Sequence, residues 1–204
     1  MGRSKKIFDR IKLLMGVDHT LDDSLVFQIM TEAQTDIAEG NLCIETSDTL
    51  PILSNTATYD EPNGFYRLKL IALSNGLVIE PEEVDKKEMD NIQKLSPFIG
   101  VGRIVYTRWN GQITFYPTPS ATDTYTLYYY AIPTAAMSQS SEPQTPPIFD
   151  KAIQYGALID IFLLTGKQDQ VPLYTSLYGQ ELQRAMTSWR RTKTTSLEIY
   201  PQEV

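Results

Sequence analysis

The chain has 204 residues, of which 42% are apolar and 21% charged, and this is the composition of an ordinary globular protein. Its single cysteine, Cys43, excludes an intramolecular disulfide, and its longest apolar run, LIDIFLLTG, is too short and too interrupted by Asp160 to span a membrane. The net charge is −7, and the excess of acidic side chains in residues 18–90 argues against broad, sequence-independent binding of nucleic acid, which needs many basic side chains.

Two amphipathic helices are predicted at the start of the chain. The segment KKIFDRIKLLMGV carries charges inside its apolar stretch, which favours a helix over a secretory signal. Its apolar positions recur at helical spacing and end before Gly16. The Asp22-Asp23-Ser24 cluster offers N-caps to a second helix, whose apolar stripe ends before Gly40. The two stripes are Ile7, Phe8, Ile11, Leu14 and Met15, and Leu25, Val26, Ile29, Met30, Ala33 and Ile37.

The middle of the chain is predicted to be a small, mostly antiparallel β element. Residues 64–73 and 76–81 read as strands, and residues 80–95 read as a short acidic helix with Glu82 and Glu83 in its first turn. The strongest local signal is RIVYTRWNGQITFYP, because its Asn110-Gly111 pair is well suited to the type I′ turn of a β-hairpin.

The strand that follows this hairpin, TYTLYYYAIP, carries large side chains on both faces. Alternation places Tyr125, Leu127, Tyr129 and Ala131 on one face and Thr124, Thr126, Tyr128 and Tyr130 on the other. Such a strand requires cover on both sides, which one small domain does not readily supply. We therefore interpret Tyr125, Tyr128, Tyr129 and Tyr130 as core and subunit-contact residues.

The last third of the chain predicts a linker and a pair of helices. Residues 134–147 are rich in Ser, Pro and Gln, and Thr145 is placed to N-cap a helix that has Pro146 in its first turn. IFDKAIQYGALIDIFLL is apolar around most of its circumference, which indicates a helix buried from several sides. A turn at Gly166 and Lys167 leads to a last helix capped by Asp169.

These elements predict an α+β fold that is mainly a helical bundle with an inserted small antiparallel β element. The bundle comprises two N-terminal helices and a C-terminal αα-hairpin, from residues 1–45 and 144–193. The β-rich insertion spans 46–143, and 194–204 form a C-terminal tail.

Charge is distributed unevenly along the chain. Residues 1–17 hold five basic and one acidic side chain, residues 18–90 hold sixteen acidic and four basic, and residues 91–204 hold nine basic and eight acidic. Most of these charges fit a solvated surface. The alternative interpretation is that the basic ends dock on an acidic partner while the acidic body is kept off DNA.

Motifs for catalysis, metals or cofactors are weak. The lone His19 lies in a polar turn, Cys43 lacks a second cysteine or a clear base, and GVG at 100–102 lacks the lysine and spacing of a phosphate loop. The carboxylates of residues 80–90 fit the solvated face of a helix better than a metal site. We expect no enzyme, no bound metal and no cofactor.

Three segments, in this order, resemble the head-to-tail adaptor (connector) proteins of tailed bacteriophages. They are Tyr116-Pro117-Thr118-Pro119, then Tyr128-Tyr129-Tyr130 closed by Pro133, then a Pro-started helix around Tyr155-Gly156-Ala157-Leu158. The resemblance implies a virion structural protein at the head–tail junction, made in the host cytoplasm. It also implies a homo-oligomeric ring, usually twelve-fold, beneath the portal protein, through which DNA passes without specific binding and with no membrane contact.

On this resemblance the basic last helix would suit docking on the portal, and the β element would face the tail (nozzle or tube) proteins. Candidate portal or subunit contacts are Arg184, Arg190, Arg191, Lys193, Tyr128, Tyr130, Tyr155 and Gly156. Two alternatives stay open at this point. One is a tail-tube or stopper ring farther down the tail, and the other is a module whose tyrosines bind carbohydrate or nucleic acid.

Overall fold

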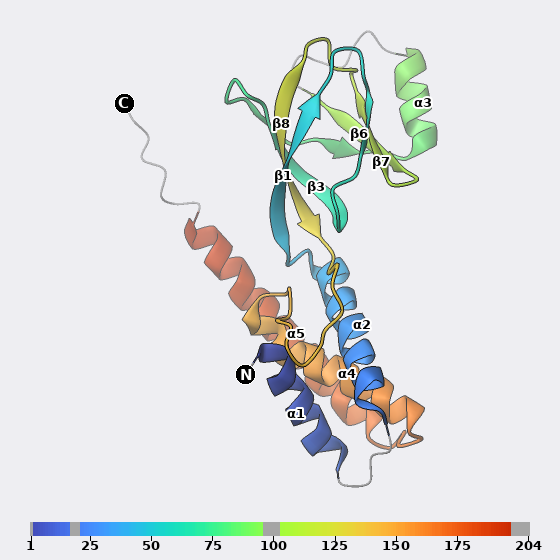
Figure 1. Cartoon of the computed structure of the whole chain (residues 1–204), viewed down its shortest axis with the longest axis vertical. Helices are drawn as coiled ribbons and strands as arrows, with labels where there is room; N and C mark the ends of the chain where they lie inside the picture. The colour runs from blue at the N-terminus through green and yellow to red at the C-terminus, as the bar shows by residue number, and fades with distance from the viewer. Residues whose placement is uncertain (1, 17–20, 96–102, 197–204) are drawn as a thin grey trace. The chain divides into compact units, whose positions relative to one another are not determined.

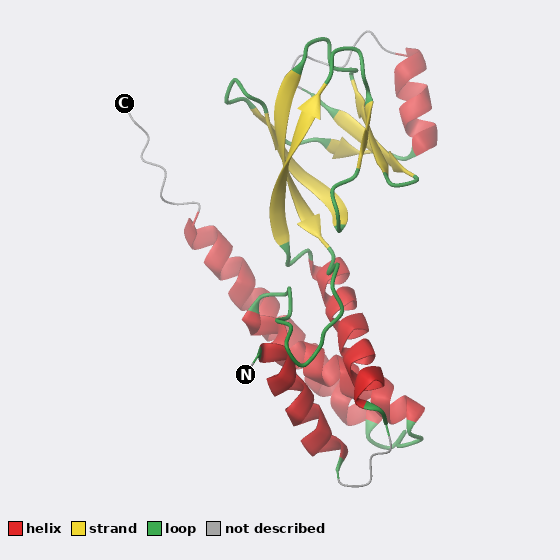
Figure 2. Ribbon diagram, viewed as in Figure 1, coloured by secondary structure: helices red, strands yellow, loops and turns green. Residues whose placement is uncertain are grey.

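The computed structural model of the chain describes residues 2–16, 21–95 and 103–196. The chain folds into two compact units (Figures 1 and 2). One is helical and combines Met1–Ile44 with Pro133–Val204, and the other is built of strands and spans Glu45–Ile132.

The helical unit is arranged around α4 (Asp150–Leu164), which follows a short 3-10 helix, η1 (Pro147–Phe149). Three helices contact α4: α1 (Arg3–Met15), α2 (Asp23–Asn41) and α5 (Val171–Ser196) (Figure 1). The apolar circumference of α4 explains its central position, because it packs against three helices at once. Its fully buried side chains are Ala152, Ile153, Ala157, Leu158 and Ile161.

Aromatic pairs and one glycine fix the packing of these helices. Phe8 of α1 stacks on Phe27 of α2 with ring centroids 4.5 Å apart, and Phe162 of α4 lies 5.0 Å from Tyr174 of α5. A Cβ at Gly156 would lie 3.4 Å from Ala33 of α2. Glycine therefore lets α4 approach its neighbour closely.

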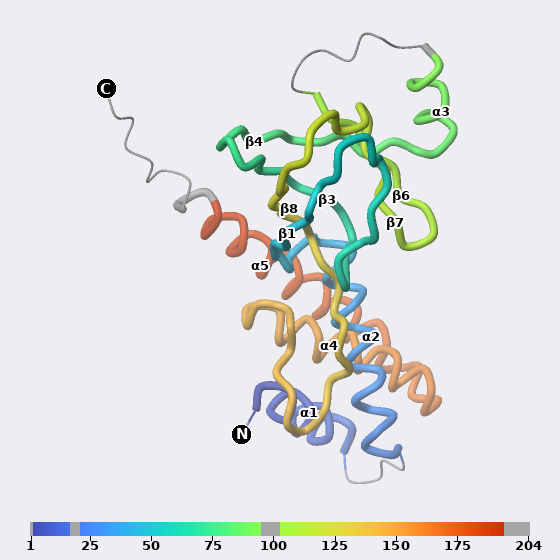
Figure 3. Tube along the Cα trace, turned by 45° about the horizontal axis from the view of Figure 1, so that its top comes forward, coloured from blue at the N-terminus to red at the C-terminus, as the bar shows by residue number. Residues whose placement is uncertain are grey.

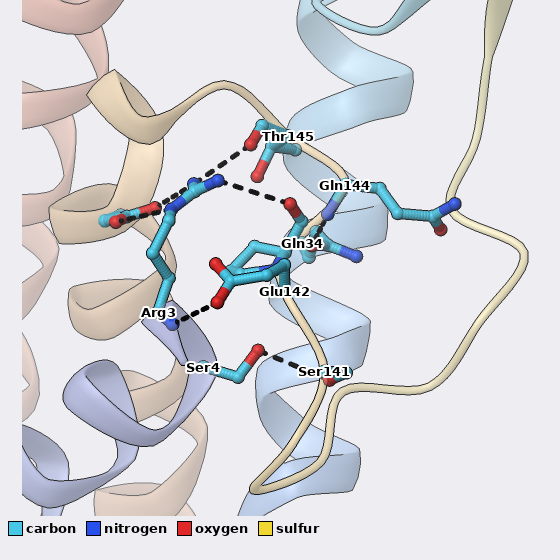
Figure 4. Close-up of polar contacts among 9 residues, drawn as sticks. Arg3, Ser4, Gln34, Ser141, Glu142, Gln144 and Thr145 are labelled. Atoms are coloured by element: carbon cyan, nitrogen blue, oxygen red, sulfur yellow. Dashed lines mark hydrogen bonds and ion pairs between the residues drawn. The ribbon is translucent and has the colours of Figure 1, made fainter. Parts of the chain in front are cut away.

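The loop that enters η1 is held by side chains of α1 and α2 (Figure 4). The Arg3 guanidinium donates to both carboxylate oxygens of Asp150, at 2.5 and 3.2 Å, and to the carbonyls of Pro143 and Thr145. The Arg3 backbone N–H donates to Glu142 at 2.9 Å, and the buried Gln34 accepts from the Gln144 N–H at 2.9 Å. The Ser/Pro-rich segment is thus an ordered part of the helical unit at these residues.

Thr145 does not cap a helix as predicted. Pro146 is the N-cap of η1 and has no capping side chain, whereas the Thr145 hydroxyl is buried and makes no hydrogen bond. The Thr145 carbonyl accepts from Arg3 instead. The long-range contact with α1 therefore prevails over the local capping signal.

The second unit contains two four-stranded sheets. The first has the order β1-β8-β3-β4, and the second has the order β2-β7-β6-β5. All strand pairs are antiparallel except β5 with β6. In chain order the elements are β1 (Glu45–Ile52), β2 (Thr58–Asp60), β3 (Phe65–Ala72), β4 (Val78–Ile79), β5 (Glu82–Glu83), α3 (Lys86–Leu95), β6 (Val105–Trp109), β7 (Gln112–Tyr116) and β8 (Asp123–Ala131).

Side chains from the two sheets meet in a shared core. The Phe115 ring of β7 lies 6.4 Å from the Tyr125 ring of β8, edge to face, and both are buried. The Leu68 N–H of β3 donates to the Tyr106 hydroxyl of β6 at 3.1 Å, and that hydroxyl donates to Glu83 at 2.9 Å. This hydrogen-bond chain satisfies a polar group that would otherwise be buried unpaired.

The prediction of a mainly helical bundle with a small β element is wrong. The described residues form eight strands in two sheets, which make a substantial unit with its own core. The main omission was β1 (ETSDTLPI), a strand at the edge of its sheet whose residues are mostly exposed, so that no apolar alternation marks it. Strands β2 and β5 are too short to leave a pattern.

Two further predictions have different outcomes. The β6–β7 hairpin is confirmed, with positive φ of 52° at Asn110 and 74° at Gly111. The acidic helix is confirmed, but its start is wrong. Glu82 and Glu83 form β5 beside β6, and the helix begins at Lys86, where Asp85 accepts a hydrogen bond from the Glu88 N–H at 2.7 Å.

Candidate interaction surfaces

The predicted basic residues lie on the second half of α5, where three of them are exposed. The Arg184 side chain is 74% exposed, and Arg190 and Arg191 are exposed as well. Arg184 and Arg191 line the same shallow hollow of about 510 Å³ on this helix. We call Arg184 and Arg191, which lie seven residues apart on the same side of α5, the basic face; Arg190 points about 100° away around the helix. The predicted Lys193 lies on the other side of α5, with its ammonium 4.9 Å above the half-buried Trp189 ring.

Helix α5 is poor in acidic side chains. Within α5 the one acidic residue is Glu181, whose carboxylate lies 3.6 Å from Arg184 and 3.5 Å from Lys151 of α4. One carboxylate is thus shared by two cations, one from α4 and one from α5. The local signal for the basic face was present in the sequence, because its members lie within eight residues of one another.

An opposite charge gathers on α2 and α4. Helix α2 contains no lysine or arginine, and its carboxylates at Glu32, Asp36 and Glu39 are exposed. Asp160 of α4 lies near two of them: burial raises its pKa, and the neighbouring charges of Asp36 and Glu32 raise it further. We call Glu32, Asp36, Glu39 and Asp160 the acidic face. None of the ion pairs formed among the described residues includes any of these four.

The acidic face was not identified from the sequence as a site. The excess of carboxylates in residues 18–90 was a signal, but Asp160 lies more than one hundred residues farther along the chain. Beside this face, a groove of about 780 Å³ runs between α2 and the loop at residues 136–140, with Phe27, Thr31, Glu32 and Met137 among its lining residues. Glu32 belongs to both the groove and the acidic face.

Exposed leucines gather at one end of the helical unit. Helices α1 and α4 run in the same direction, since Arg3 pairs with Asp150 at their starts and Lys167 donates to the Met15 carbonyl at their ends, at 3.2 Å. This end exposes Leu13, Leu14, Leu163, Leu164 and Leu173. Leu14, predicted in the buried stripe of the first helix, is 41% exposed. Sequence reasoning missed this patch because its members come from three helices.

The two faces of β8 differ in burial. Tyr125 and Tyr129 point into the core and are buried, and burial raises the pKa of both. On the outer face Tyr128 is 42% exposed, and Tyr130 is half-buried beneath the Lys69 ammonium, which lies 5.7 Å from its ring centroid. Tyr128 therefore offers the largest exposed ring of this strand, beside Leu70 of β3 in the register.

Tyr155 and Gly156 lie inside the helical unit. The half-buried Tyr155 ring lies 6.0 Å from that of Tyr174, and a Cβ at Gly156 would lie 3.4 Å from both Ala33 and Tyr178. Both residues serve packing between helices of one chain. Their contact with a second subunit stays a prediction.

Comparison with known families decides the class of protein. Residues 5–199 match the family model described as SU10 adaptor protein. The chain belongs to the SU10 adaptor family. A search of curated proteins finds no match. The family is one of phage structural adaptors and not a class of enzymes, so the protein is a structural component of a bacteriophage virion.

The residues considered as candidates for catalysis or metal binding show few features of such sites. Cys43 is buried, and burial raises the pKa of its thiol to about 11, so that it is protonated at neutral pH. His19 lies outside the described residues. Within residues 2–16, 21–95 and 103–196, no group of three metal-ligating side chains gathers, and no helix is long and apolar enough to cross a membrane.

Two arginines of the β unit, Arg103 and Arg108, could contact nucleic acid. Both are paired with carboxylates of the same chain. The Arg108 guanidinium donates to Glu61 at 2.8 and 3.1 Å and to backbone carbonyls of β3. Arg103 forms an ion pair with Glu82. Two of the four tyrosines of β8 are also buried, which leaves fewer rings on which bases could stack.

Proposed function

We propose that this adaptor is a head-to-tail connector that forms a ring, expected to be twelve-fold, and docks on the portal protein. The tail proteins would attach to the same ring, and DNA would pass through its channel. The observation that carries the proposal is the family match over residues 5–199, which covers almost the whole chain. The adaptor segments quoted from the sequence lie within that match.

The surfaces of the helical unit support assembly with other protein molecules. It exposes a basic face, an acidic face and an end with five exposed leucines. Exposed apolar patches on soluble proteins commonly mark protein contacts. We therefore assign these three exposed surfaces to contacts with other protein molecules.

The net charge supports passage of DNA without binding. Each copy carries −7, and a ring of such copies repels the phosphate backbone overall. Like charges release no counterions on approach, so the main source of sequence-independent affinity for DNA is absent.

The test is native mass spectrometry of the full-length chain, alone and after mixing with the portal protein of the same phage. A complex of portal with many copies of the adaptor is the expected result, and its mass gives the stoichiometry. A ring that ignores portal would indicate a stopper or tail-tube position instead. A monomer in both samples would refute the proposal.

A further inference from the structure

We propose that neighbouring subunits contact one another through the acidic face of one copy and the basic face of the next. This inference rests on the proposed ring and names the surfaces that would build it. It commits to one occupant for each face, namely a second copy of this chain.

Charge complementarity is the first argument. The basic face presents two arginines on a helix with one acidic residue, and the acidic face presents four carboxylates, three of them on a helix without a basic residue. No described cation pairs with those carboxylates. A surface of each sign on one chain allows identical copies to attract one another.

The state of Asp160 is the second argument. Its carboxylate is partly desolvated and has two further carboxylates, Asp36 and Glu32, as electrostatic neighbours. Mutual repulsion makes this arrangement unfavourable in an isolated chain. Cations brought by the basic face of another copy would offset that repulsion.

The placement of the two faces is the third argument. In Figures 1 and 3 the last turns of α5 extend to the left of the helical unit, while α2 lies on its right. Helix α4 lies between them and contacts both. Because α4 separates α2 from the last turns of α5, the two faces can repeat head to tail from copy to copy, which is the geometry that generates closed rings.

Surface relief agrees with this pairing. The groove of about 780 Å³ along α2 shares Glu32 with the acidic face, and the hollow of about 510 Å³ on α5 lies between Arg184 and Arg191. Side chains of a second copy can enter the groove and bury apolar surface there, in addition to the attraction between charges.

The experiment uses two full-length variants with opposite charge reversals. The acid-reversed variant carries Glu32→Lys and Asp36→Lys, and the base-reversed variant carries Arg184→Glu and Arg191→Glu. For each variant alone, the fraction of chains in rings should fall roughly tenfold or more, because like charges then face each other at every contact. Mixed in equal amounts they should recover rings, because every contact in an alternating ring again joins opposite charges.

Native mass spectrometry, with and without portal protein, reads out this experiment. The mixture should give rings with equal numbers of the two variants and no odd-numbered ring. Circular dichroism of each variant checks that its helices are intact. A matched control, Lys6→Glu with Arg10→Glu on the exposed surface of α1, changes the charge as much as the base-reversed variant and should leave rings unchanged.

The outcomes separate this inference from the function on which it rests. Wild-type rings with no loss in either variant would overturn the pairing and leave the connector function standing. Loss of portal binding by the base-reversed variant, with rings retained, would also overturn the pairing, because the basic face would then be the contact with portal. Absence of wild-type rings in both conditions would remove the function and the inference together.

Discussion

At the residue scale, Arg3 shows how one side chain holds distant segments together. It binds Asp150 with two hydrogen bonds and also binds two carbonyls of the loop before η1. Both charged side chains are mostly buried, at 24% and 28% exposure. Because hydrogen bonds to charged groups contribute about 1.5–3 kcal/mol, Arg3→Ala should lower the free energy of unfolding by roughly 2 kcal/mol.

Urea unfolding of the helical unit, followed by circular dichroism at low protein concentration, measures this loss. Arg3→Lys keeps the charge but loses the planar fork, so its stability should fall between those of wild type and Arg3→Ala. The exposed Lys6→Ala is the control and should change stability by less than about 0.5 kcal/mol. Equal effects of Arg3→Ala and Lys6→Ala would refute this role.

Asp160 predicts a dependence on pH at the same scale. Burial, Asp36 and Glu32 raise its pKa in the folded chain above that of the unfolded chain. Its favourable contribution is therefore present below the unfolded pKa of about 3.9 and is lost as the pH rises through the higher folded pKa. Asp160→Asn should stabilise the chain at pH 7, and this gain should shrink toward pH 3.

Thermal unfolding of wild type and Asp160→Asn across this pH range tests the prediction. Asp169→Asn, an exposed carboxylate on the turn between α4 and α5, is the control in the same unit. A stability difference for Asp160→Asn that stays constant with pH would show that its charge is not the cause.

At the element scale, Gly156 limits how α4 packs. A Cβ there already reaches contact distance from Ala33 and Tyr178, whereas nothing lies within 4 Å of a Cβ at Gly179 on α5. Gly156→Leu should lower the free energy of unfolding by about 1–3 kcal/mol through overpacking. Gly179→Leu places the same side chain in open space and should raise stability slightly, because leucine favours a helix over glycine.

Both variants replace a glycine with leucine, and urea unfolding followed by circular dichroism distinguishes their effects. A loss of the same size at both glycines would mean that close packing at Gly156 is not what the helical unit requires. Retention of stability in Gly156→Leu would mean that α2 and α5 can move apart to admit the side chain.

The elements divide clearly into those that the sequence predicts and those it does not. The β6–β7 hairpin depends on Asn110-Gly111 and α4 on a continuous apolar surface, and both signals are local. Strand β1 depends on pairing with β8, more than seventy residues away, and its exposed residues have no periodic pattern. The number of strands, and hence the size of the β unit, could not be read from local patterns.

The candidate surfaces follow the same rule. The basic face was visible because its arginines are close in sequence, and Tyr128 was visible in the alternation of its strand. The exposed leucines and the acidic face are assembled by tertiary packing from α1, α2, α4 and α5. Tyr155 and Gly156 stood out for their place in the resemblance, but the structure gives them contacts within the chain.

At the scale of the whole molecule, the charge pairing predicts that salt weakens the ring. Contacts between exposed charges are screened over about 10 Å at 0.1 M salt and about 3 Å at 1 M. Raising sodium chloride from about 0.05 M to about 0.5 M should therefore reduce the fraction of assembled chains severalfold. Analytical ultracentrifugation at fixed protein concentration measures that fraction without perturbing the chain.

The exposed leucines are the alternative subunit contact, and they predict the opposite response to salt. A ring held mainly by Leu13, Leu163, Leu164 and Leu173 would gain from salt, or be indifferent to it, because burial of apolar surface is not screened. Sodium sulfate, which strengthens apolar contacts, extends the comparison. Assembly that rises with both salts would place the subunit contact at the leucines, and assembly that falls with sodium chloride would place it between the charged faces.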